Sequence, residues 1–237
     1  MASRNRMHPL LAMRLMRELR KDPDDTAAAI RVVAAMAGNS GRRRFERFLQ
    51  SDEGARILRE KRDLYDILTD RERLKAMPPG SLGRTIIDWF EREGISTEGL
   101  AQASEAARGG AAVGMSEDEQ TFGSRQRNLH DVFHVVAGYD RDLRGEAAVL
   151  AFTLGQTFNW GIAYLVWSGL RAEGWSSPGG KLIREGYRRG RRAEPLLQQD
   201  WEELFERPIG EVREQLGIGA PPVYEQIRSA AAPALGA

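Results

Sequence analysis

The stretch AAVLAFTLGQTFNWGIAYLVWSGL, from Ala147 to Leu170, contains no charged residue, and the rest of the chain is interpreted around it. At ~1.5 Å per residue, one helix of this length could cross the ~30 Å hydrocarbon core of a membrane. Polar and glycine residues argue against insertion, because a bilayer offers polar side chains few partners. These residues are Thr153, Gln156, Thr157, Asn159, Gly155, Gly161 and Gly169. We therefore expect a long uncharged central helix in a bundle, with a membrane-dipping element or the wall of a lipid-binding cavity as alternatives.

Helix signals lie on both sides of this stretch, and we find no alternating strand pattern with hairpin signals and no repeat. Pro9 suits the first position of a helix, because proline needs no amide partner there. Suitable N-cap residues follow at Asp24 or Asp25, Ser51, Ser81 and Ser116, the last with Glu119 as a capping box. The sequence predicts an all-α, single-domain helical bundle.

We divide this bundle into N-terminal amphipathic helices over residues 1–50, a helical core over 51–220 and a flexible tail over 221–237. Residues 1–21 are basic, and Leu11, Leu15 and Leu19 recur at every fourth position, which favours an amphipathic first helix. A mitochondrial-type targeting segment of similar composition is the alternative. Gly109, Gly110 and Gly114 predict a loop and not a domain linker.

Composition restricts the chemistry that the chain can perform. Its 237 residues are 41% hydrophobic and 29% charged, which is typical of a folded domain. The net charge is +1, from 35 basic and 34 acidic residues, and argues against a general nucleic-acid binder. Because there is no cysteine, disulfides, thiolate nucleophiles and cysteine-ligated metals are excluded. Histidine occurs only at His8, His130 and His134.

Residues 183–192 contain five arginines, at Arg184, Arg188, Arg189, Arg191 and Arg192. We interpret this segment as the solvated face of a helix, with acidic residues nearby to balance the charge. Contact with anionic lipid headgroups or a phosphate is the alternative interpretation.

The segment most informative about function is His130-Asp131-Val132-Phe133-His134. Residues four apart share one face of a helix, so both imidazoles can approach one cation, with Asp131 beside them. Glu146 would lie ~18 Å from His134 along a continuous helix, but it can return to the histidines if the chain reverses near Gly138. Two imidazoles and one or two carboxylates form a ligand set for Zn²⁺, Fe²⁺ or Mn²⁺.

Two other interpretations of these residues remain open. The histidines can simply be structural and bind their neighbours by hydrogen bonds. A zinc peptidase would have the pattern His-Glu-x-x-His, in which the glutamate is the general base. Here the acidic residue is Asp131 and no third histidine follows, so hydrolysis of a peptide or phosphate bond is the weaker interpretation.

The pattern His-Asp-x-x-His, followed by eleven residues and Glu, resembles the signature of the fourth protein of the Coq series in ubiquinone (coenzyme Q) biosynthesis. The four positions are His130, Asp131, His134 and Glu146. Further similar positions are residues 78–84 (PPGSLGR), Arg125, Arg127, Gly138, Tyr139, Gly145, Tyr187, Gly190, Trp201, Glu202 and Arg213. The resemblance covers roughly residues 60–220.

This resemblance implies an all-helical fold with a metal bound by His130, Asp131, His134 and Glu146. Zinc is the metal implied first, with iron or manganese as alternatives. The implied ligand is a polyprenyl hydroxybenzoate or another quinone-precursor lipid. The implied reaction is oxidative decarboxylation, in which a hydroxyl replaces the carboxylate, and the other implied role is a non-catalytic prenyl-lipid-binding scaffold for the biosynthetic enzymes.

The residues near the motif are compatible with that chemistry. Asp131 could bind the metal or orient an imidazole, and Arg125 or Arg127 could pair with the carboxylate that is lost. We therefore expect all three to be catalytic. Expected partners are the other ubiquinone biosynthesis enzymes, a membrane surface and a second copy of the chain, with no nucleic acid. The expected location is the cytoplasmic face of a bacterial inner membrane, or the matrix face in a mitochondrion.

Overall fold

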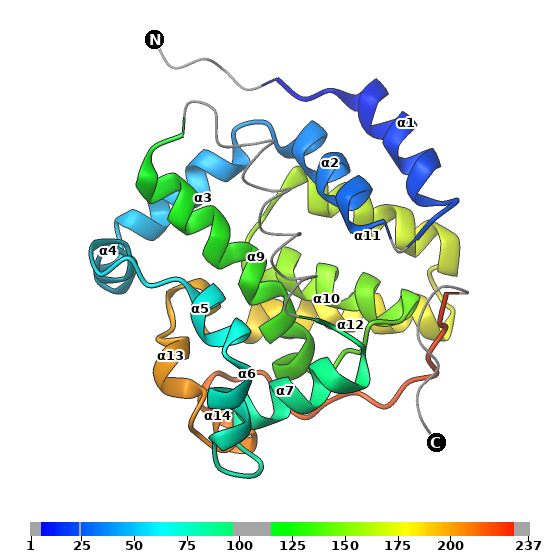
Figure 1. Cartoon of the computed structure of the whole chain (residues 1–237). Helices are drawn as coiled ribbons and strands as arrows, with labels where there is room; N and C mark the ends of the chain where they lie inside the picture. The colour runs from blue at the N-terminus through cyan, green and yellow to red at the C-terminus, as the bar shows by residue number, and fades with distance from the viewer. Residues whose placement is uncertain (1–5, 24, 97–114, 230–237) are drawn as a thin grey trace. The chain divides into compact units, whose positions relative to one another are not determined.

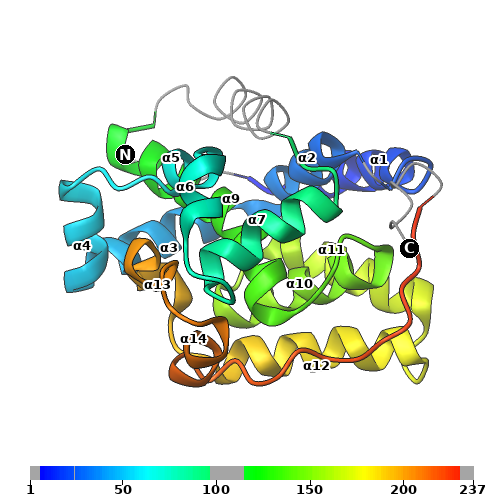
Figure 2. The same cartoon turned by 60° about the horizontal axis from the view of Figure 1, so that its bottom comes forward.

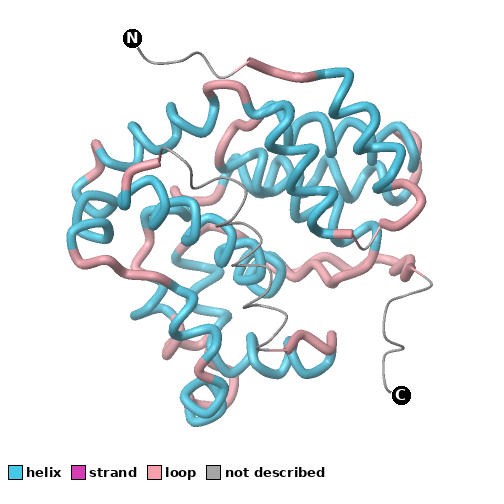
Figure 3. The backbone as a smooth tube through the Cα atoms, turned by 45° about the horizontal axis from the view of Figure 1, so that its top comes forward, coloured by secondary structure: helices cyan, strands magenta, loops and turns pink. Residues whose placement is uncertain are grey.

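The structure is a computed structural model that describes residues 6–23, 25–96 and 115–229. Figure 3 shows helices joined by loops, and the described residues include no β-strand. The predicted all-α fold is therefore confirmed. The loop expected at residues 109–114 lies outside the described residues.

The chain forms two compact units, whose helices carry the labels given in Figure 1. The first contains residues 1–46, 139–193 and 222–232, and the second contains residues 47–138, 194–221 and 233–237. The first unit holds α1 (Pro9–Leu19), α2 (Thr26–Ala37), α10 (Leu143–Gln156), α11 (Trp160–Glu173) and α12 (Pro178–Arg192). α3 (Ser40–Leu49) runs from the first unit into the second. The predicted divisions at residues 50 and 220 stay predictions.

The second unit is assembled from shorter helices and one long one. It contains α4 (Asp52–Arg59), α5 (Leu64–Thr69), α6 (Arg71–Ala76), α7 (Leu82–Arg92), α9 (Glu117–Ala137), the 3₁₀ turn η1 (Leu196–Gln198), α13 (Trp201–Leu204) and α14 (Ile209–Gln215). α4, α5, α7 and α14 all pack against α9, which is therefore the centre of this unit.

The predicted helix starts are confirmed where the structure describes them. The side chains of Asp25, Ser51 and Ser81 each accept a hydrogen bond from a backbone N–H in the first turn of α2, α4 and α7. At the start of α9, Ser116 and Glu119 form the predicted capping box. Short polar side chains fix these ends because the first N–H groups of a helix have no partner inside it.

The uncharged stretch does not form one long helix, so this part of the prediction is wrong. α10 ends at Gln156 and α11 begins at Trp160, with Thr157 in an extended conformation. Asn159 is buried, and its side-chain oxygen accepts hydrogen bonds from the N–H groups of Gly161 and Ile162 at 2.7 and 3.3 Å. An asparagine that caps a new helix competes with continuation of the old one, and it interrupts the stretch here.

No described helix combines the length and the apolar character that crossing a membrane requires.

α10 and α12 lie side by side and approach each other closely through glycines (Figure 2). A Cβ atom at Gly186 would lie 2.5 Å from the carbonyl oxygen of Ala148, and one at Gly190 would lie 2.1 Å from that of Phe152. Any side chain at these positions would therefore force the two backbones apart. The amide of Gln156 adds a hydrogen bond of 2.6 Å to the carbonyl of Gly190.

The arginine-rich segment lies on α12 and is only partly solvated. Arg188, Arg191 and Arg192 are exposed, as expected for a solvated face. Arg189 is buried, with its guanidinium 5.2 Å from the ring centre of Tyr139, and Arg184 lies 4.7 Å from the ring of Trp175. Two of the five arginines thus contact aromatic rings within the unit, a contact that stabilises a cation.

The first predicted helix is present as α1, which begins at Pro9 as expected. Leu15 is buried and Leu19 is partly buried against the core that α1 shares with α2 and α11, whereas Leu11 is 45% exposed. The buried face is therefore displaced from the predicted leucine stripe, with Ala12 and Met16 beside Leu15.

Residues 222–229, predicted as part of a flexible tail, are extended and hydrogen bonded. The carbonyl of Ile227 accepts from the N–H of Leu143 at 2.8 Å, at the start of α10. The hydroxyl of Tyr224 donates to Asp142 at 2.7 Å and accepts from the N–H of Asp140 at 2.9 Å. This segment therefore fixes the turn that precedes α10, a role that the sequence did not predict.

Candidate metal centre

The two predicted histidine ligands lie one turn apart on α9 and face each other. The Nε2 atoms of His130 and His134 are 3.2 Å apart, and the rings are nearly perpendicular, at 86°. His134 is buried, at 1% exposure, and His130 is partly exposed. The i, i+4 spacing produces this arrangement directly, because such residues share one face of a helix.

The distance between the two nitrogens suits a single cation. Zinc–imidazole bonds of ~2.0–2.1 Å at a tetrahedral angle place two nitrogens about 3.3 Å apart. The observed 3.2 Å agrees with this value. Two neutral imidazoles at this distance can also share one proton in a hydrogen bond, so the pair suits either a proton or a metal ion.

Glu146 completes a group that could hold a metal ion. One ligand atom from each of His130, His134 and Glu146 lies within 4.8 Å of the other two. Glu146 is in the first turn of α10, where a carboxylate is also favoured by the helix dipole. The role of Glu146 as a metal ligand stays a prediction. A set of two imidazoles and one carboxylate suits Zn²⁺, Fe²⁺ or Mn²⁺ and leaves coordination positions for a ligand.

The end of α9 that carries the histidines is fixed by its neighbours in the second unit. Arg213 on α14 donates hydrogen bonds to the carbonyls of Val136 and Val135, at 2.9 and 3.0 Å. Gly138 then ends the helix in the left-handed conformation, at φ 75°, and a side chain there would overlap Pro221. These contacts satisfy carbonyls that the helix end would otherwise leave unpaired.

The ring of Trp89, on α7, stacks against His134. The two ring centres are 5.3 Å apart and the planes differ by 25°. Trp89 is 4% exposed, so this contact forms a buried wall beside the imidazole. A stacked aromatic restricts rotation of the histidine ring, which keeps its Nε2 directed at His130.

Asp131, the fourth predicted ligand, is not part of the group of three. It is partly buried and lies three positions before His134, which on a helix places it beside the histidines without making it a member of the group. Its role as a ligand or as a catalytic residue therefore stays a prediction.

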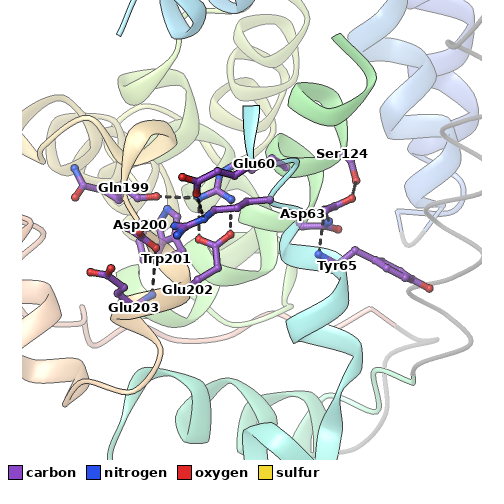
Figure 4. Close-up of polar contacts among 12 residues, drawn as sticks. Glu60, Asp63, Tyr65, Ser124, Gln199, Asp200, Trp201, Glu202 and Glu203 are labelled. Atoms are coloured by element: carbon purple, nitrogen blue, oxygen red, sulfur yellow. Dashed lines mark hydrogen bonds and ion pairs between the residues drawn. The ribbon is translucent and has the colours of Figure 1, made fainter. Parts of the chain in front are cut away.

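Arg125, expected to pair with a substrate carboxylate, has protein partners. Its guanidinium donates to Glu202 at 2.9 and 3.3 Å and to the carbonyl of Gln199 at 2.9 Å, and its side chain is 1% exposed. Both of its Nη atoms are thus occupied by the protein, and its catalytic role stays a prediction. Figure 4 shows Gln199 and Glu202 in this cluster. Arg127, two residues further along α9, is partly buried, and its catalytic role also stays a prediction.

Asp200 lies in the same cluster (Figure 4) and binds two more arginines. Arg56 and Arg62 donate to one of its carboxylate oxygens at 2.6 and 2.5 Å. Burial alone would raise the pKa of Asp200, but the hydrogen bonds from Arg62 and Arg56 outweigh burial, so the pKa lies below its ordinary value. This carboxylate is therefore ionised and structural at neutral pH.

Sequence reasoning missed the supporting residues of the site. Trp89 was not singled out, and Arg213 entered only through the family resemblance. Nothing in the spacing of the sequence signals that α7 and α14 pack on the histidine-bearing end of α9, since the contacts join segments far apart in the chain.

Comparison with known proteins places the chain in a family. The family described as "Coenzyme Q (ubiquinone) biosynthesis protein Coq4" matches residues 20–222. Ubiquinone biosynthesis protein coq-4, mitochondrial, of Neurospora crassa is 29% identical over 187 residues, which cover 76% of this chain and 50% of the relative. The corresponding protein of Zygosaccharomyces rouxii is 31% identical and covers 76% of this chain and 53% of the relative. The chain thus spans about half the length of these two relatives.

A solved structure shares the fold. The crystal structure of a candidate ubiquinone biosynthesis protein from Nostoc punctiforme superposes with a TM-score of 0.65, covering 91% of this chain and 100% of that one. At 21% identity this likeness supports the fold alone. The family match, in contrast, extends over most of the sequence and includes every residue of the candidate metal centre. This chain belongs to the Coq4 family of ubiquinone biosynthesis proteins.

Proposed function

We propose that this protein is a metal-dependent enzyme that replaces the carboxylate of a polyprenyl hydroxybenzoate with a hydroxyl group. In this reaction the bond from the ring to the carboxyl carbon breaks, CO₂ leaves and a ring–oxygen bond forms. With dioxygen as the oxidant, one oxygen atom enters the ring and the other leaves as water, with two electrons from an external donor. The observation that supports this proposal is the group formed by His130, His134 and Glu146.

The residues of the site have separate tasks in this proposal. His130, His134 and Glu146 would hold the metal, which as a Lewis acid would bind and polarise a phenolate or carboxylate oxygen of the substrate. Trp89 covers one face of His134 and excludes water from it. Arg213 keeps the end of α9 in place, so that both imidazoles present their Nε2 atoms at one point.

Removal of one imidazole tests the proposal. We expect purified protein to retain about one divalent metal per chain, and His134→Ala to remove both the metal and quinone production in cells. His8→Ala is the matched control, because His8 is exposed and lies outside the metal group. Loss of the metal with quinone production intact would contradict the catalytic proposal.

We further propose that the protein works at a membrane surface, where a polyprenyl substrate resides. Trp160, Tyr164, Trp167 and Arg171 follow each other at spacings of four, three and four on α11, which places them on one side of the helix. Trp160 and Trp167 are 50% and 52% exposed, and the guanidinium of Arg171 lies 5.4 Å from the ring of Trp167. Tryptophan with a nearby cation favours the headgroup region of an anionic membrane.

Sedimentation with vesicles tests this surface. We expect the Trp160→Ala, Trp167→Ala double variant to bind phosphatidylcholine–phosphatidylglycerol vesicles more weakly than the wild type. Leu49→Ala is the control, because Leu49 is 45% exposed and lies outside this side of α11. Equal binding of all three proteins would contradict the assignment. The curated relatives are mitochondrial by name, and we propose the matrix face of the inner membrane for a mitochondrial setting and the cytoplasmic face for a bacterial one.

The alternative function is a scaffold that binds a prenyl lipid and organises the other ubiquinone biosynthesis enzymes without turnover. The exposed aromatic residues of α11 would serve this role equally well. Turnover of a prenylated hydroxybenzoate by the isolated protein, with metal and oxygen supplied, would exclude a purely organising role. The expected homodimer and the partner enzymes stay predictions.

A further inference from the structure

Trp89 has a feature that its packing does not explain. Its indole Nε1 atom is buried, and it has no hydrogen-bond partner among the residues that the structure describes. Buried N–H groups are nearly always paired, because an unpaired one has lost its hydration without replacement. A phenylalanine at this position would keep the aromatic contact with His134 and would not bury an unpaired donor.

The other buried tryptophan of the second unit shows the usual arrangement. Trp201 is 0% exposed, and its Nε1–H donates to the carbonyl of Leu196 at 2.8 Å. The two residues therefore have the same side chain and nearly the same burial. They differ in one respect. The indole N–H of Trp201 has an acceptor within the protein, and that of Trp89 has none among the described residues.

We propose that the indole N–H of Trp89 donates a hydrogen bond to an anionic oxygen of the aromatic ligand at the candidate metal centre. The indole stacks on His134, one of the proposed metal ligands, so the residue that carries this unpaired donor borders the candidate metal centre. An indole N–H is a donor only, and it therefore selects an acceptor such as a phenolate or carboxylate oxygen. The inference rests on the proposed function and adds a ligand-orienting residue to it.

The experiment compares Trp89→Phe with Trp201→Phe in the full-length, zinc-loaded protein. The probe is 4-hydroxybenzoate, which carries both a phenol and a carboxylate, and its affinity is measured by isothermal titration calorimetry. Loss of one hydrogen bond to a charged oxygen predicts that W89F binds the probe about tenfold more weakly. W201F is expected to bind it with wild-type affinity.

Two further readouts do not depend on the affinity. In the ¹H–¹⁵N spectrum, the indole resonance that W89F lacks identifies Trp89, and we expect the probe to move it downfield in the wild type. In urea unfolding without ligand, we expect W89F to be less destabilised than W201F, because only W201F loses an internal hydrogen bond.

The outcomes separate this inference from the function on which it rests. Equal probe affinity of the wild type and W89F, or an unmoved Trp89 resonance, would overturn the inference and leave the proposed function intact. A destabilisation of W89F as large as that of W201F would also overturn it, because it would reveal an acceptor within the protein. Failure of the wild type to bind the probe would overturn both.

Discussion

The two halves of α9 differ in how their polar side chains are paired. In the first half, Arg125 binds the carboxylate of Glu202 and Ser124 donates to Asp63, which also accepts from Asn128 just beyond the midpoint. In each of these bonds an N–H or O–H group donates to a carboxylate oxygen. In the second half, His130 and His134 present nitrogen to nitrogen. Two imidazole nitrogens at 3.2 Å can share one proton or one cation, so we interpret the first half of the helix as structural and propose the second half as the one that binds metal.

The largest expected effect comes from breaking the structural half. Arg125→Ala removes a buried guanidinium and leaves Glu202 without its main partner, which we expect to lower the free energy of unfolding by about 3 kcal/mol. Urea unfolding followed by circular dichroism measures this change. Arg125→Lys keeps the positive charge but cannot donate two parallel hydrogen bonds to Glu202, so its free energy of unfolding should lie between those of the wild type and Arg125→Ala. A loss no larger than that of an average surface substitution would remove the contrast between the halves.

Substitutions in the second half of α9, which carries the histidines, should change how much zinc stabilises the protein. Zinc at about 100 times its Kd is expected to stabilise the wild type by about 2.7 kcal/mol. His134→Gln should lose this stabilisation, measured against the stability of the same variant without metal, because one of the two imidazole ligands is gone. His8→Gln serves as the control. Equal zinc stabilisation of H134Q and the wild type would contradict the assignment.

A smaller effect is expected at the residue that supports the binding half. Arg213→Met removes two hydrogen bonds to the carbonyls of Val135 and Val136, which we expect to cost about 2 kcal/mol. Zinc affinity should fall as well, because the histidine-bearing end of α9 becomes less fixed. Stability and zinc affinity are measured on the same preparation by thermal unfolding and calorimetry. If stability falls and zinc affinity does not, Arg213 has no part in positioning the site.

The smallest effect concerns pH. The pKa of Asp200 is lowered by Arg62 and Arg56, so its ion pairs stabilise the fold at pH values above the ordinary carboxyl pKa of ~3.9, and this contribution is lost as the pH falls through the lowered pKa. Asp200→Asn keeps the α13 cap and should cost about 1 kcal/mol at pH 7. Unfolding of both proteins between pH 7 and pH 2 should show this difference shrinking in acid. A constant difference would mean that the charge of Asp200 contributes nothing.

Local features of the fold were predictable from the sequence. The sequence indicates helix starts at Ser51, Ser81 and Ser116, because capping depends only on residues within one turn. The facing imidazoles of His130 and His134 follow from a spacing of four on one helix. The sequence also allowed α9 to end near Gly138, whose left-handed conformation ends the helix.

What was not predictable depends on contacts between distant segments. Arg125 and Glu202 are 77 residues apart, and no local pattern links them. The break at Asn159 was missed because the absence of charge favoured one continuous helix, whereas a single capping side chain began a second one. The contact of Trp89 with His134 was not predicted, since stacking on a particular histidine is decided by the packing of α7 on α9.

Anomalous diffraction from crystals of the zinc-loaded protein, recorded at the zinc absorption edge, tests the central claim most directly. The account predicts one zinc ion per chain, at ~2.0–2.1 Å from Nε2 of both His130 and His134, with a carboxylate oxygen of Glu146 as a further ligand. An ion bound elsewhere on the chain, or an anomalous map with no peak between the two imidazoles, would contradict it.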